Sequence, residues 1–134
     1  MLRSPRSRAP RTSSVRKLTL AVDVGEAINP DGVINQIEGG AIQATSWVLK
    51  ERVRFDRQRI TSTSWTEYPI LRFSEVPDVE VELIQRPEMD PVGAGEAAHG
   101  PVTAAIANAV FDCARRAGAR SSDHARQPHR RNGD

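Results

Sequence analysis

Two short stretches of the chain alternate hydrophobic and polar positions as a half-buried strand does. In residues 15–25 the apolar side chains of Leu18, Leu20 and Val22 recur at every second position, and the stretch ends in the turn-forming sequence Asp-Val-Gly. In residues 79–85, VEVELIQ, valine and leucine alternate with two glutamates. We therefore predict one strand in each stretch, and the second has the more regular pattern.

Two longer stretches have the period of a helix instead. In residues 30–49 apolar residues recur three or four positions apart, Asn29 is a suitable N-cap, and Pro30 suits the first helical position. Residues 100–118 repeat the pattern, with a proline in the first turn and two arginines before the glycine that ends the range. We predict a helix over each range.

The middle of the chain has a mixed pattern. Residues 51–64 alternate around the polar sequence Asp-Arg-Gln-Arg, which predicts a hairpin with one exposed face. Residues 65–78 contain two prolines and predict an extended connection over the surface. The whole order of elements, which contains no internal repeat, favours the α+β class, with two main helices packed on a small antiparallel or mixed sheet.

Composition changes this picture at the two ends of the chain. Residues 1–14 and 119–134 are rich in arginine and serine, and we predict that they are disordered basic tails on a single domain at 15–118. The formal net charge of the chain is +2, although acidic residues outnumber lysine and arginine within the domain. We expect no nucleic-acid partner, because the pattern predicts no basic stripe with interleaved aromatic residues on a folded face.

Targeting and cysteine content narrow the classes further. No apolar run is long enough to span a membrane. The first twenty residues lack the apolar segment of a secretory signal. The sequence alone does not decide between the cytoplasm and the periplasm. The single cysteine, Cys113, excludes an internal disulfide and every multi-cysteine metal site. Because it lies among apolar residues of the second predicted helix, we expect a buried, unreactive thiol.

Side chains that could hold a metal ion directly follow no known arrangement. Asp23, Glu26 and Asp31 lie close together in the sequence, but their spacing matches no calcium or zinc site. Two of the three histidines fall in the predicted C-terminal tail. We therefore predict no metal that is bound by protein side chains.

The loop between the second strand and the second helix has an unusual composition. Residues 91–100, PVGAGEAAHG, surround one acidic residue, Glu96, with small residues that allow a close approach to backbone, next to the free amide groups of a helix N-terminus. Glu96 is either a solvated acid in a linker, a cap of the following helix, or a general base in a site. His99 is either solvated or backbone-bonded, or a proton-transfer partner.

A second cluster of small residues interrupts the first predicted helix. Gly39 and Gly40 each cost about 1 kcal/mol of helix stability against alanine, so the pair indicates close approach by another helix, a backbone or a ligand. Gln36 and Glu38 lie beside them. The amide of Gln36 can donate to and accept from a cofactor at once, or both side chains can form an ordinary exposed face.

Several common catalytic motifs are absent from the sequence. It contains no G-x-S-x-G, no P-loop and no H-E-x-x-H. The G-x-G formed by Gly93 and Gly95 lacks the third glycine and the acid after a second strand that a dinucleotide-binding fold requires. Simple hydrolase, nucleotide-hydrolase and Rossmann functions are therefore excluded.

Three segments, taken in order, resemble one known family: AVDVGEAINPDGVINQIEGG at 21–40, TEYPILRFSEVPDVEVELI at 66–84 and GAGEAAHGPVTAAIANAVFDC at 93–113. Together they resemble the C-terminal end of the molybdopterin-binding large subunit of the xanthine dehydrogenase and aldehyde oxidase family. The bacterial branch typified by the isoquinoline 1-oxidoreductase beta subunit is especially similar. The resemblance covers about residues 15–118, and its most specific parts are N-P-x-x-x-x-x-Q-I-E-G-G and the G-E loop followed by A-I-A-N-A.

The resemblance implies roles for particular positions. Glu96 matches the catalytic base of the family, which lies beside the molybdenum. Gln36 matches a glutamine that contacts the molybdopterin cofactor, and the backbone around Gly39, Gly40 and Gly95 would line the same cavity. The implied reaction is the oxidative hydroxylation of an aldehyde or an electron-poor N-heterocycle.

The resemblance also implies a cofactor and partners. In bacterial members the molybdopterin is usually the cytosine dinucleotide form, and electrons leave through an iron–sulfur small subunit. Large subunits of the family run to several hundred residues, so the remaining large-subunit domains would have to complete the site, and we expect this chain to be inactive alone. The alternative is a non-catalytic remnant or protein-interaction module, and either form should expose apolar surface.

Two departures from the family pattern affect these expectations. The family usually has a proline directly after the loop glutamate, where this chain has Ala97. After Ala114 the sequence leaves the usual ending of the family and continues into the basic C-terminal segment. The first departure bears directly on how Glu96 is held in place.

Overall fold

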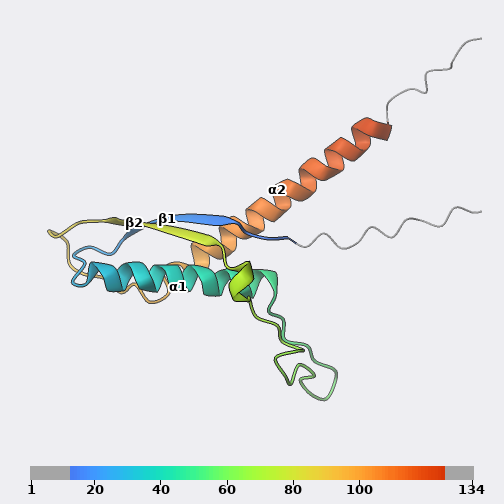
Figure 1. Ribbon diagram of the computed structural model, residues 1–134, viewed down its shortest axis with the longest axis horizontal. Helices are drawn as coiled ribbons and strands as arrows, with labels where there is room; N and C mark the ends of the chain where they lie inside the picture. Colours follow the sequence, from blue (N-terminus) through green and yellow to red (C-terminus); the bar gives the residue numbers. More distant parts are fainter. Residues whose placement is uncertain (1–12, 126–134) are drawn as a thin grey trace, which may run out of the picture.

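The computed structural model describes residues 13–125 of the chain. Its elements, in order, are β1 (Lys17–Asp23), α1 (Pro30–Leu49), the short 3-10 helix η1 (Phe73–Glu75), β2 (Asp78–Ile84) and α2 (His99–Ala125). Figure 1 shows α1 running alongside the two strands, with the beginning of α2 beside them. The predicted α+β class, with two main helices and a small sheet, is confirmed.

The two strands pair in the parallel direction, over a register that runs from Lys17 opposite Asp78 to Asp23 opposite Ile84. Parallel neighbours need a long crossover connection, and residues 24–77, which include α1, provide it. The expectation of an antiparallel or mixed sheet was wrong in this respect. Alternation of apolar and polar residues is the same in both directions, so the pattern of the strands could not reveal the pairing.

One face of the sheet packs on the helices and the other is exposed. Along both strands half-buried residues alternate with exposed ones, as the sequence pattern predicts. The buried core beneath the half-buried face is formed by α1, the loop before α2 and the first turns of α2. Its members are Ile37, Ala41, Ala44, Ala98, Val102 and Ile106. Four of these six residues are alanine or valine, and their small side chains let α1, α2 and the sheet pack close together.

Helix α1 has the bounds that its capping residues predict. The Asn29 side chain accepts a hydrogen bond from the Gly32 amide at 3.0 Å, Pro30 occupies the first helical position, and Asp31 places a negative charge in the first turn. On the buried face, the Thr45 hydroxyl donates to the Ala41 carbonyl at 2.8 Å and is thereby satisfied inside the core. The predicted helix over 30–49 is confirmed.

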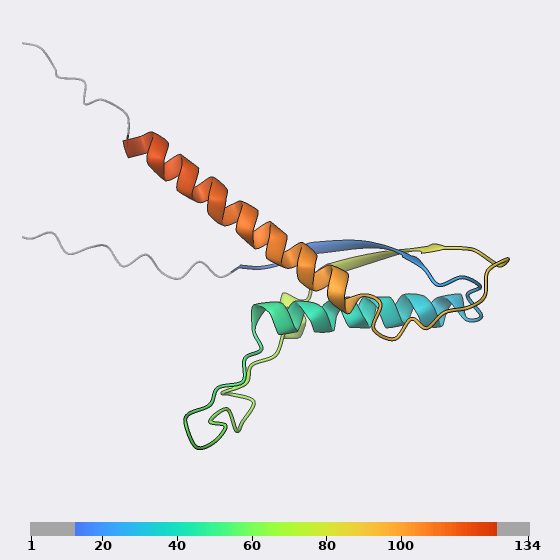
Figure 2. The same cartoon turned by 180° about the vertical axis from the view of Figure 1, so that it is seen from behind.

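Helix α2 is longer than the sequence pattern predicted. It continues to Ala125, seven residues past the expected end at 118, so the first part of the predicted C-terminal tail is helical. Within the described part of the chain, its last buried residue is Ile106, and from there α2 leads away from the rest of the structure (Figures 1 and 2). The other predictions of disorder fall largely on residues 1–12 and 126–134, which lie outside the described residues.

The position of Cys113 corrects one expectation. Its thiol is exposed rather than buried. The apolar stripe of α2 does continue through Val110 to Cys113, but α2 has left the core by then, and Val110 is itself exposed. A stripe at helical spacing indicates which face is apolar, and it does not indicate where along the helix the covering layer ends.

Residues 51–76 form a projection that we call the lobe (Figure 1). The predicted hairpin is reduced to one antiparallel bridge between Phe55 and Ile60, closed by a turn in which the Asp56 carboxylate accepts the amides of Gln58 and Arg59 at 2.7 and 2.9 Å. The remainder of the lobe is irregular apart from η1. The expectation of a long surface connection with little regular structure therefore describes it well.

The lobe is joined to the end of α1 by a small polar cluster. The Ser46 hydroxyl donates to the Glu51 carboxylate and accepts the Leu71 amide at 2.9 Å. The Tyr68 hydroxyl donates to the other oxygen of Glu51 at 2.8 Å, and this hydrogen bond raises the pKa of Tyr68. Lys50 and Glu75 form an ion pair beside it. These contacts fix the base of the lobe and leave its tip exposed.

Among the described residues, no helix combines the length and apolar character needed to cross a bilayer.

Candidate functional site

The segment leading to Glu96 is fastened to the end of β1 by backbone contacts. The Glu26 amide donates to the Met89 carbonyl and the Val92 amide donates to the Val24 carbonyl, both at 2.9 Å. Gly25 makes this approach possible: its φ is +68°, and a Cβ there would lie 2.1 Å from the Asp90 carbonyl oxygen. The loop is thus brought across the N-terminal end of α1.

Gln36 and the glycine-rich loop meet directly. The Gln36 side-chain amide donates to the Gly95 carbonyl at 2.8 Å, across 59 positions of sequence. Gln36 and Gly95 were both predicted site residues, and the structure brings them together beside Glu96. Gln36 is an exposed residue, and within the described part of the chain its amide oxygen accepts no hydrogen bond.

Glu96 lies in the turn of residues 95–98 that leads into α2; we call it the Glu96 turn. Its backbone carbonyl accepts the His99 amide at 3.2 Å, which joins the turn to the first residue of the helix. The residue is exposed, and within the described part of the chain its carboxylate takes part in no hydrogen bond or ion pair. The carboxylate is therefore free to meet a ligand that lies against the loop.

His99 contacts α1 on the far side of that turn. Its Nε2 lies 3.0 Å from the Gln43 amide oxygen, and its ring stacks on Trp47 with centroids 4.9 Å apart and planes inclined by 21°. The other ring nitrogen, Nδ1, is buried and has no hydrogen-bond partner among the described residues. The sequence indicated His99 as a candidate but gave no sign of Gln43 or Trp47. The one signal that could have found Gln43 is its position seven residues after Gln36, on the same face of a helix.

The two glycines of α1 have different surroundings. A Cβ on Gly40 would lie 3.3 Å from the Ala98 Cβ and 3.4 Å from the His99 Cε1, so this glycine admits the start of α2. A Cβ on Gly39 or Gly95 would meet no described atom within 4 Å. The close approach predicted from the glycine pair is thus made by another helix at Gly40, while Gly39 and Gly95 border open space.

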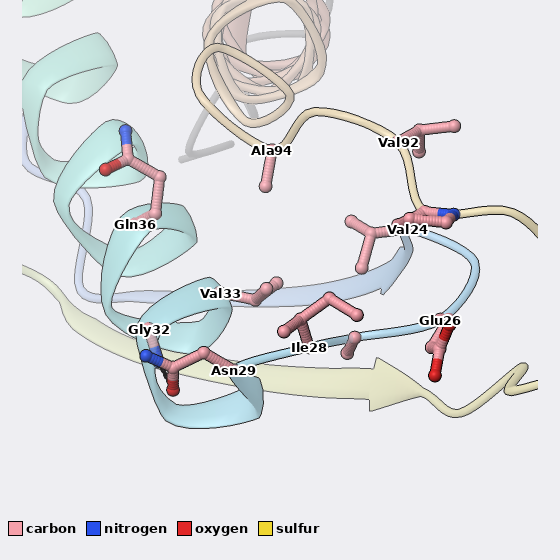
Figure 3. A pocket seen from close by; sticks show the side chains of 11 residues that line it. Val24, Glu26, Ile28, Asn29, Gly32, Val33, Gln36, Val92 and Ala94 are labelled. Atoms are coloured by element: carbon pink, nitrogen blue, oxygen red, sulfur yellow. Dashed lines mark hydrogen bonds between the residues drawn. The ribbon is translucent and has the colours of Figure 1, made fainter.

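A pocket of about 360 Å³ lies between the N-terminal end of α1 and the loop (Figure 3). Gln36 stands at one edge and Ala94 at the other, while valines and Ile28 form the floor. Several of the lining residues, including Ile28, Asn29 and Val92, are exposed in the chain. The pocket is therefore a recess with one side missing rather than an enclosed cavity.

A second recess, of about 260 Å³, lies on the other side of the Glu96 turn. It is bounded by β1, by Ile37 of α1 and by small residues that include Ala97, Ala98 and Ala105. Since Ala94 lines the first recess and Ala97 the second, Glu96 stands in the chain between the two. The loop of residues 91–98 thus contributes to the lining of both recesses, and Glu96 is its one ionisable side chain.

Ion pairs and hydrogen bonds shift the pKa values of several groups in the sheet and in the lobe. On the sheet, the hydrogen bond from Lys17 lowers the pKa of Glu80 and raises the pKa of Lys17. In the lobe, contacts with Lys50 lower the pKa of Glu75. Three or more His, Cys, Asp or Glu side chains do not gather anywhere in the described residues in a way that would hold a metal ion.

Comparison with known proteins identifies relatives of the chain. Residues 11–77 match the model of a family described as the molybdopterin cofactor-binding domain. A nicotinate dehydrogenase subunit of Pseudomonas putida (strain KT2440) is 46% identical over 99 residues, which are 74% of this chain and 8% of that protein. The beta subunit of isoquinoline 1-oxidoreductase from Brevundimonas diminuta is 40% identical over 79 residues, 59% of this chain and 10% of that protein.

A solved structure has the same arrangement of elements. The match is to the Cu,Mo-CO dehydrogenase in its carbon monoxide reduced state, with a TM-score of 0.67 and 25% sequence identity, over 74% of this chain and 13% of that one. The chain thus spans about a tenth of the length of the relatives that it matches.

Proposed function

The chain belongs to the molybdopterin cofactor-binding domain family, and from this premise we propose that it forms one wall of the cofactor site of a molybdenum hydroxylase. The observation that carries the proposal is the contact between the Gln36 amide and the Gly95 carbonyl. That contact holds the thin loop and its free carboxylate, Glu96, beside the open face of α1.

The residues around this contact are suited to line one side of a cofactor site. Gly39 and Gly95 leave backbone accessible, because no described atom lies within 4 Å of where a Cβ would be. The amide oxygen of the exposed Gln36 accepts no hydrogen bond among the described residues, so it is available to a ligand. Ligand sites commonly enclose about 70–90% of a ligand's surface, whereas the recess beside Gln36 is open to solvent on one side. The remaining walls must come from elsewhere.

The binding roles fall on Gln36 and on the glycines. Gln36 would hydrogen-bond the cofactor through its free amide oxygen, and the backbone at Gly39 and Gly95 would lie against it. Gly40 would not contact the cofactor; its lack of a side chain lets the start of α2 pack closely on α1, which positions the loop. The cytosine dinucleotide form of molybdopterin is the form we propose.

We assign the chemical role to Glu96. When bound, the molybdenum cofactor would accept the two electrons that leave the substrate carbon. The Glu96 carboxylate would accept a proton from the hydroxyl group, derived from water, whose oxygen bonds to that carbon as the C–H bond breaks, which is general-base catalysis. Aldehydes and electron-poor N-heterocycles are the proposed substrates, in keeping with relatives named for nicotinate and isoquinoline.

The proposed partners are the remaining large-subunit domains and an iron–sulfur small subunit. Two of the relatives are named as subunits, and this chain spans 8% and 10% of their lengths. The chain on its own would therefore be inactive. The exposed apolar side chains around the site, such as Ile28 and Val92, would be covered in the completed protein.

The experiment is to restore a truncated relative. The nicotinate dehydrogenase subunit of Pseudomonas putida is produced without the 99 residues that this chain matches, together with its natural partner and this chain. We expect the purified complex to contain molybdenum and to oxidise nicotinate with a dye as electron acceptor. Glu96→Gln should abolish oxidation, a loss of at least about a hundredfold for a general base, with molybdenum retained.

Glu82→Gln is the matched control, since Glu82 is an exposed glutamate on the outer face of β2. It should leave both oxidation and molybdenum content unchanged. If a complex forms and Glu96→Gln oxidises nicotinate at the unaltered rate, Glu96 is not the base. If the complex forms but holds no molybdenum, the chain does not contribute a cofactor wall.

A non-catalytic interaction module is the second candidate, and the lobe is the observation that favours it. Phe55, Trp65 and Phe73 are exposed there by 77%, 76% and 101%, more than residues of this size usually are on a free surface. Under this alternative the truncated relative would bind the chain through the lobe without gaining molybdenum. Removing all three aromatic side chains would then abolish binding.

A further inference from the structure

The Glu96 turn is attached to α1 at both of its ends. Before Glu96, the Gln36 amide holds the Gly95 carbonyl at 2.8 Å. After it, the His99 ring is held by Gln43, with 3.0 Å between Nε2 and the amide oxygen. The two glutamines are seven residues apart, close to two helical turns, so both extend from one face of α1 and suspend the turn between them.

The attachment at His99 is more extensive than one hydrogen bond. The ring stacks on Trp47, four residues after Gln43 and therefore on the same face of α1. Gly40 lies about one helical turn before Gln43 and has no side chain, so the His99 ring can come close to α1. A Cβ on Gly40 would lie only 3.4 Å from the His99 Cε1. Gln43, Trp47 and Gly40 thus form a seat for one imidazole.

We propose that His99 is a positioning residue, whose imidazole, seated on Gln43 and Trp47, fixes the backbone of the Glu96 turn. The inference rests on the proposed role of Glu96, since only then does the placement of its carboxylate bear on chemistry. It assigns His99 no contact with substrate or cofactor.

The turn has little of its own to hold it in one conformation. Ala97 carries no ring that would restrict its φ, as a proline would. Its amide reaches the Ala94 carbonyl at 3.5 Å, at the limit of hydrogen-bond distance. Apart from the buried Ala98 and the hydrogen bond from the His99 amide to the Glu96 carbonyl, the turn is therefore held by its attachments to α1 at Gly95 and at the His99 ring.

The same geometry argues against His99 as the proton-transfer partner of Glu96. With the Gln43 oxygen facing Nε2, that nitrogen carries the hydrogen and donates it. Nδ1 is buried and meets no donor among the described residues. A phenyl ring would stack on Trp47 without leaving a buried nitrogen unpaired, so the imidazole is explained by its hydrogen bond to Gln43.

The test is amide hydrogen exchange in the complete 134-residue chain, without any cofactor, followed by NMR at Ala97 and His99. Gln43→Leu and His99→Phe each remove the hydrogen bond between residues 43 and 99, and each keeps a ring at position 99 that can stack on Trp47. We expect each variant to speed exchange at both amides about fivefold, the equivalent of one net hydrogen bond, and the double variant to add nothing. Gln43→Glu, which keeps an acceptor oxygen, should retain slow exchange.

The control is Gln58→Leu, the same substitution at an exposed glutamine of the lobe. It should leave exchange at Ala97 and His99 unchanged, and exchange of the Leu20 amide in β1 should be unchanged in every variant. Unaltered exchange at Ala97 and His99 in both Gln43→Leu and His99→Phe would overturn the proposal. So would equal acceleration at Leu20, which would mean general destabilisation. Since no molybdenum is involved, these outcomes are independent of whether the cofactor proposal holds.

Discussion

The body of the molecule and its lobe are stabilised in different ways. The body, which comprises residues 17–49 and 77–98 and the first turns of α2, contains all of the buried apolar residues of the described chain. The lobe, residues 51–76, contains no buried residue, although it carries large aromatic side chains. Its shape depends on polar contacts within the turn at Asp56 and at the Ser46–Glu51–Tyr68 cluster.

This difference in packing suits the body and the lobe to different roles. The body has the close packing that a precisely placed loop requires, and the predicted site residues all lie in it. The lobe exposes apolar surface on a weakly stabilised framework, which is typical of a segment that is completed by contact with another chain or domain. The proposed site therefore lies in the well-packed body, and the exposed aromatic side chains lie in the lobe.

The largest effect should come from one substitution made in both regions. Ile37 is 1% exposed and Ile60 is 57% exposed. Ile37→Ala should lower the free energy of unfolding by about 2–5 kcal/mol because it leaves a cavity under the sheet. Ile60→Ala should change it by less than about 0.5 kcal/mol. Urea unfolding followed by circular dichroism measures both.

If Ile37→Ala is too unstable to fold, the milder pair Ile37→Val and Ile60→Val retains the comparison. The buried substitution should then cost about 0.5–1.5 kcal/mol and the exposed one close to nothing. Equal losses at the two positions would show that the lobe shares the core and would remove the distinction.

A smaller effect should separate two adjacent glycines within the body. Gly39→Ala should stabilise the free chain by up to about 1 kcal/mol, because alanine favours the helix and its Cβ would point into open space. Gly40→Ala gains the same propensity but forces Ala98 and His99 to move, so it should be less stabilising than Gly39→Ala or destabilising. Urea midpoints of the two variants give the answer.

The glycine pair also sharpens the cofactor assignment. In the restored complex, Gly39→Ala should reduce the molybdenum content although it stabilises the free chain, because the methyl group would occupy the cofactor side. A Gly39→Ala complex that holds molybdenum as well as the unaltered one would remove Gly39 from the cavity.

The smallest effect should appear on acidification, in the lobe. Hydrogen bonds from the amides of Gln58 and Arg59 lower the pKa of Asp56, and the Thr63 amide lowers the pKa of Glu67, from ordinary values of 3.8 and 4.5. A carboxyl whose pKa is lowered by folding stabilises the folded form above its ordinary pKa, and this contribution disappears as the pH falls through the lowered value. The lobe should therefore loosen below about pH 4.

NMR amide signals measure the acid effect residue by residue. The signals of Gln58, Arg59 and Thr63 should move as the pH falls below about 4, before the core amides of α1 change. Asp56→Asn should abolish the movement at Gln58 and Arg59 and leave that at Thr63. Simultaneous change in lobe and core would contradict the account.

Much of the fold could be predicted because its signals are local. Period-two alternation gave both strands, and Asn29 with Pro30 gave the start of α1. The parallel pairing and the exposure of Cys113 could not be predicted in this way, because both depend on which layer meets which. Pairing direction follows from the path of the crossover, and the exposure of Cys113 follows from where α2 leaves the core.

In the candidate site, too, the residues could be predicted from local signals, but the contacts between them could not. Small residues and a single carboxylate indicated the loop around Glu96, the glycine pair indicated Gln36, and the resemblance added the molybdopterin role of Gln36. None of these suggested that Gln36 would bond to Gly95, or that His99 would stack on Trp47, because side chains 59 and 52 positions apart in sequence leave no periodic signal. The specific role assigned to each of these residues remains a prediction.

The most direct test of the central claim, that the body supplies a cofactor wall through Gln36, is the molybdenum content of the restored complex. At equal protein, the complex with the unaltered chain should hold a stoichiometric amount of molybdenum, and so should Gln58→Leu in the lobe. Gln36→Leu should hold about a tenth as much or less, since one hydrogen bond to the cofactor and one to the loop are lost together. Equal molybdenum in the Gln36→Leu and Gln58→Leu complexes would contradict the account.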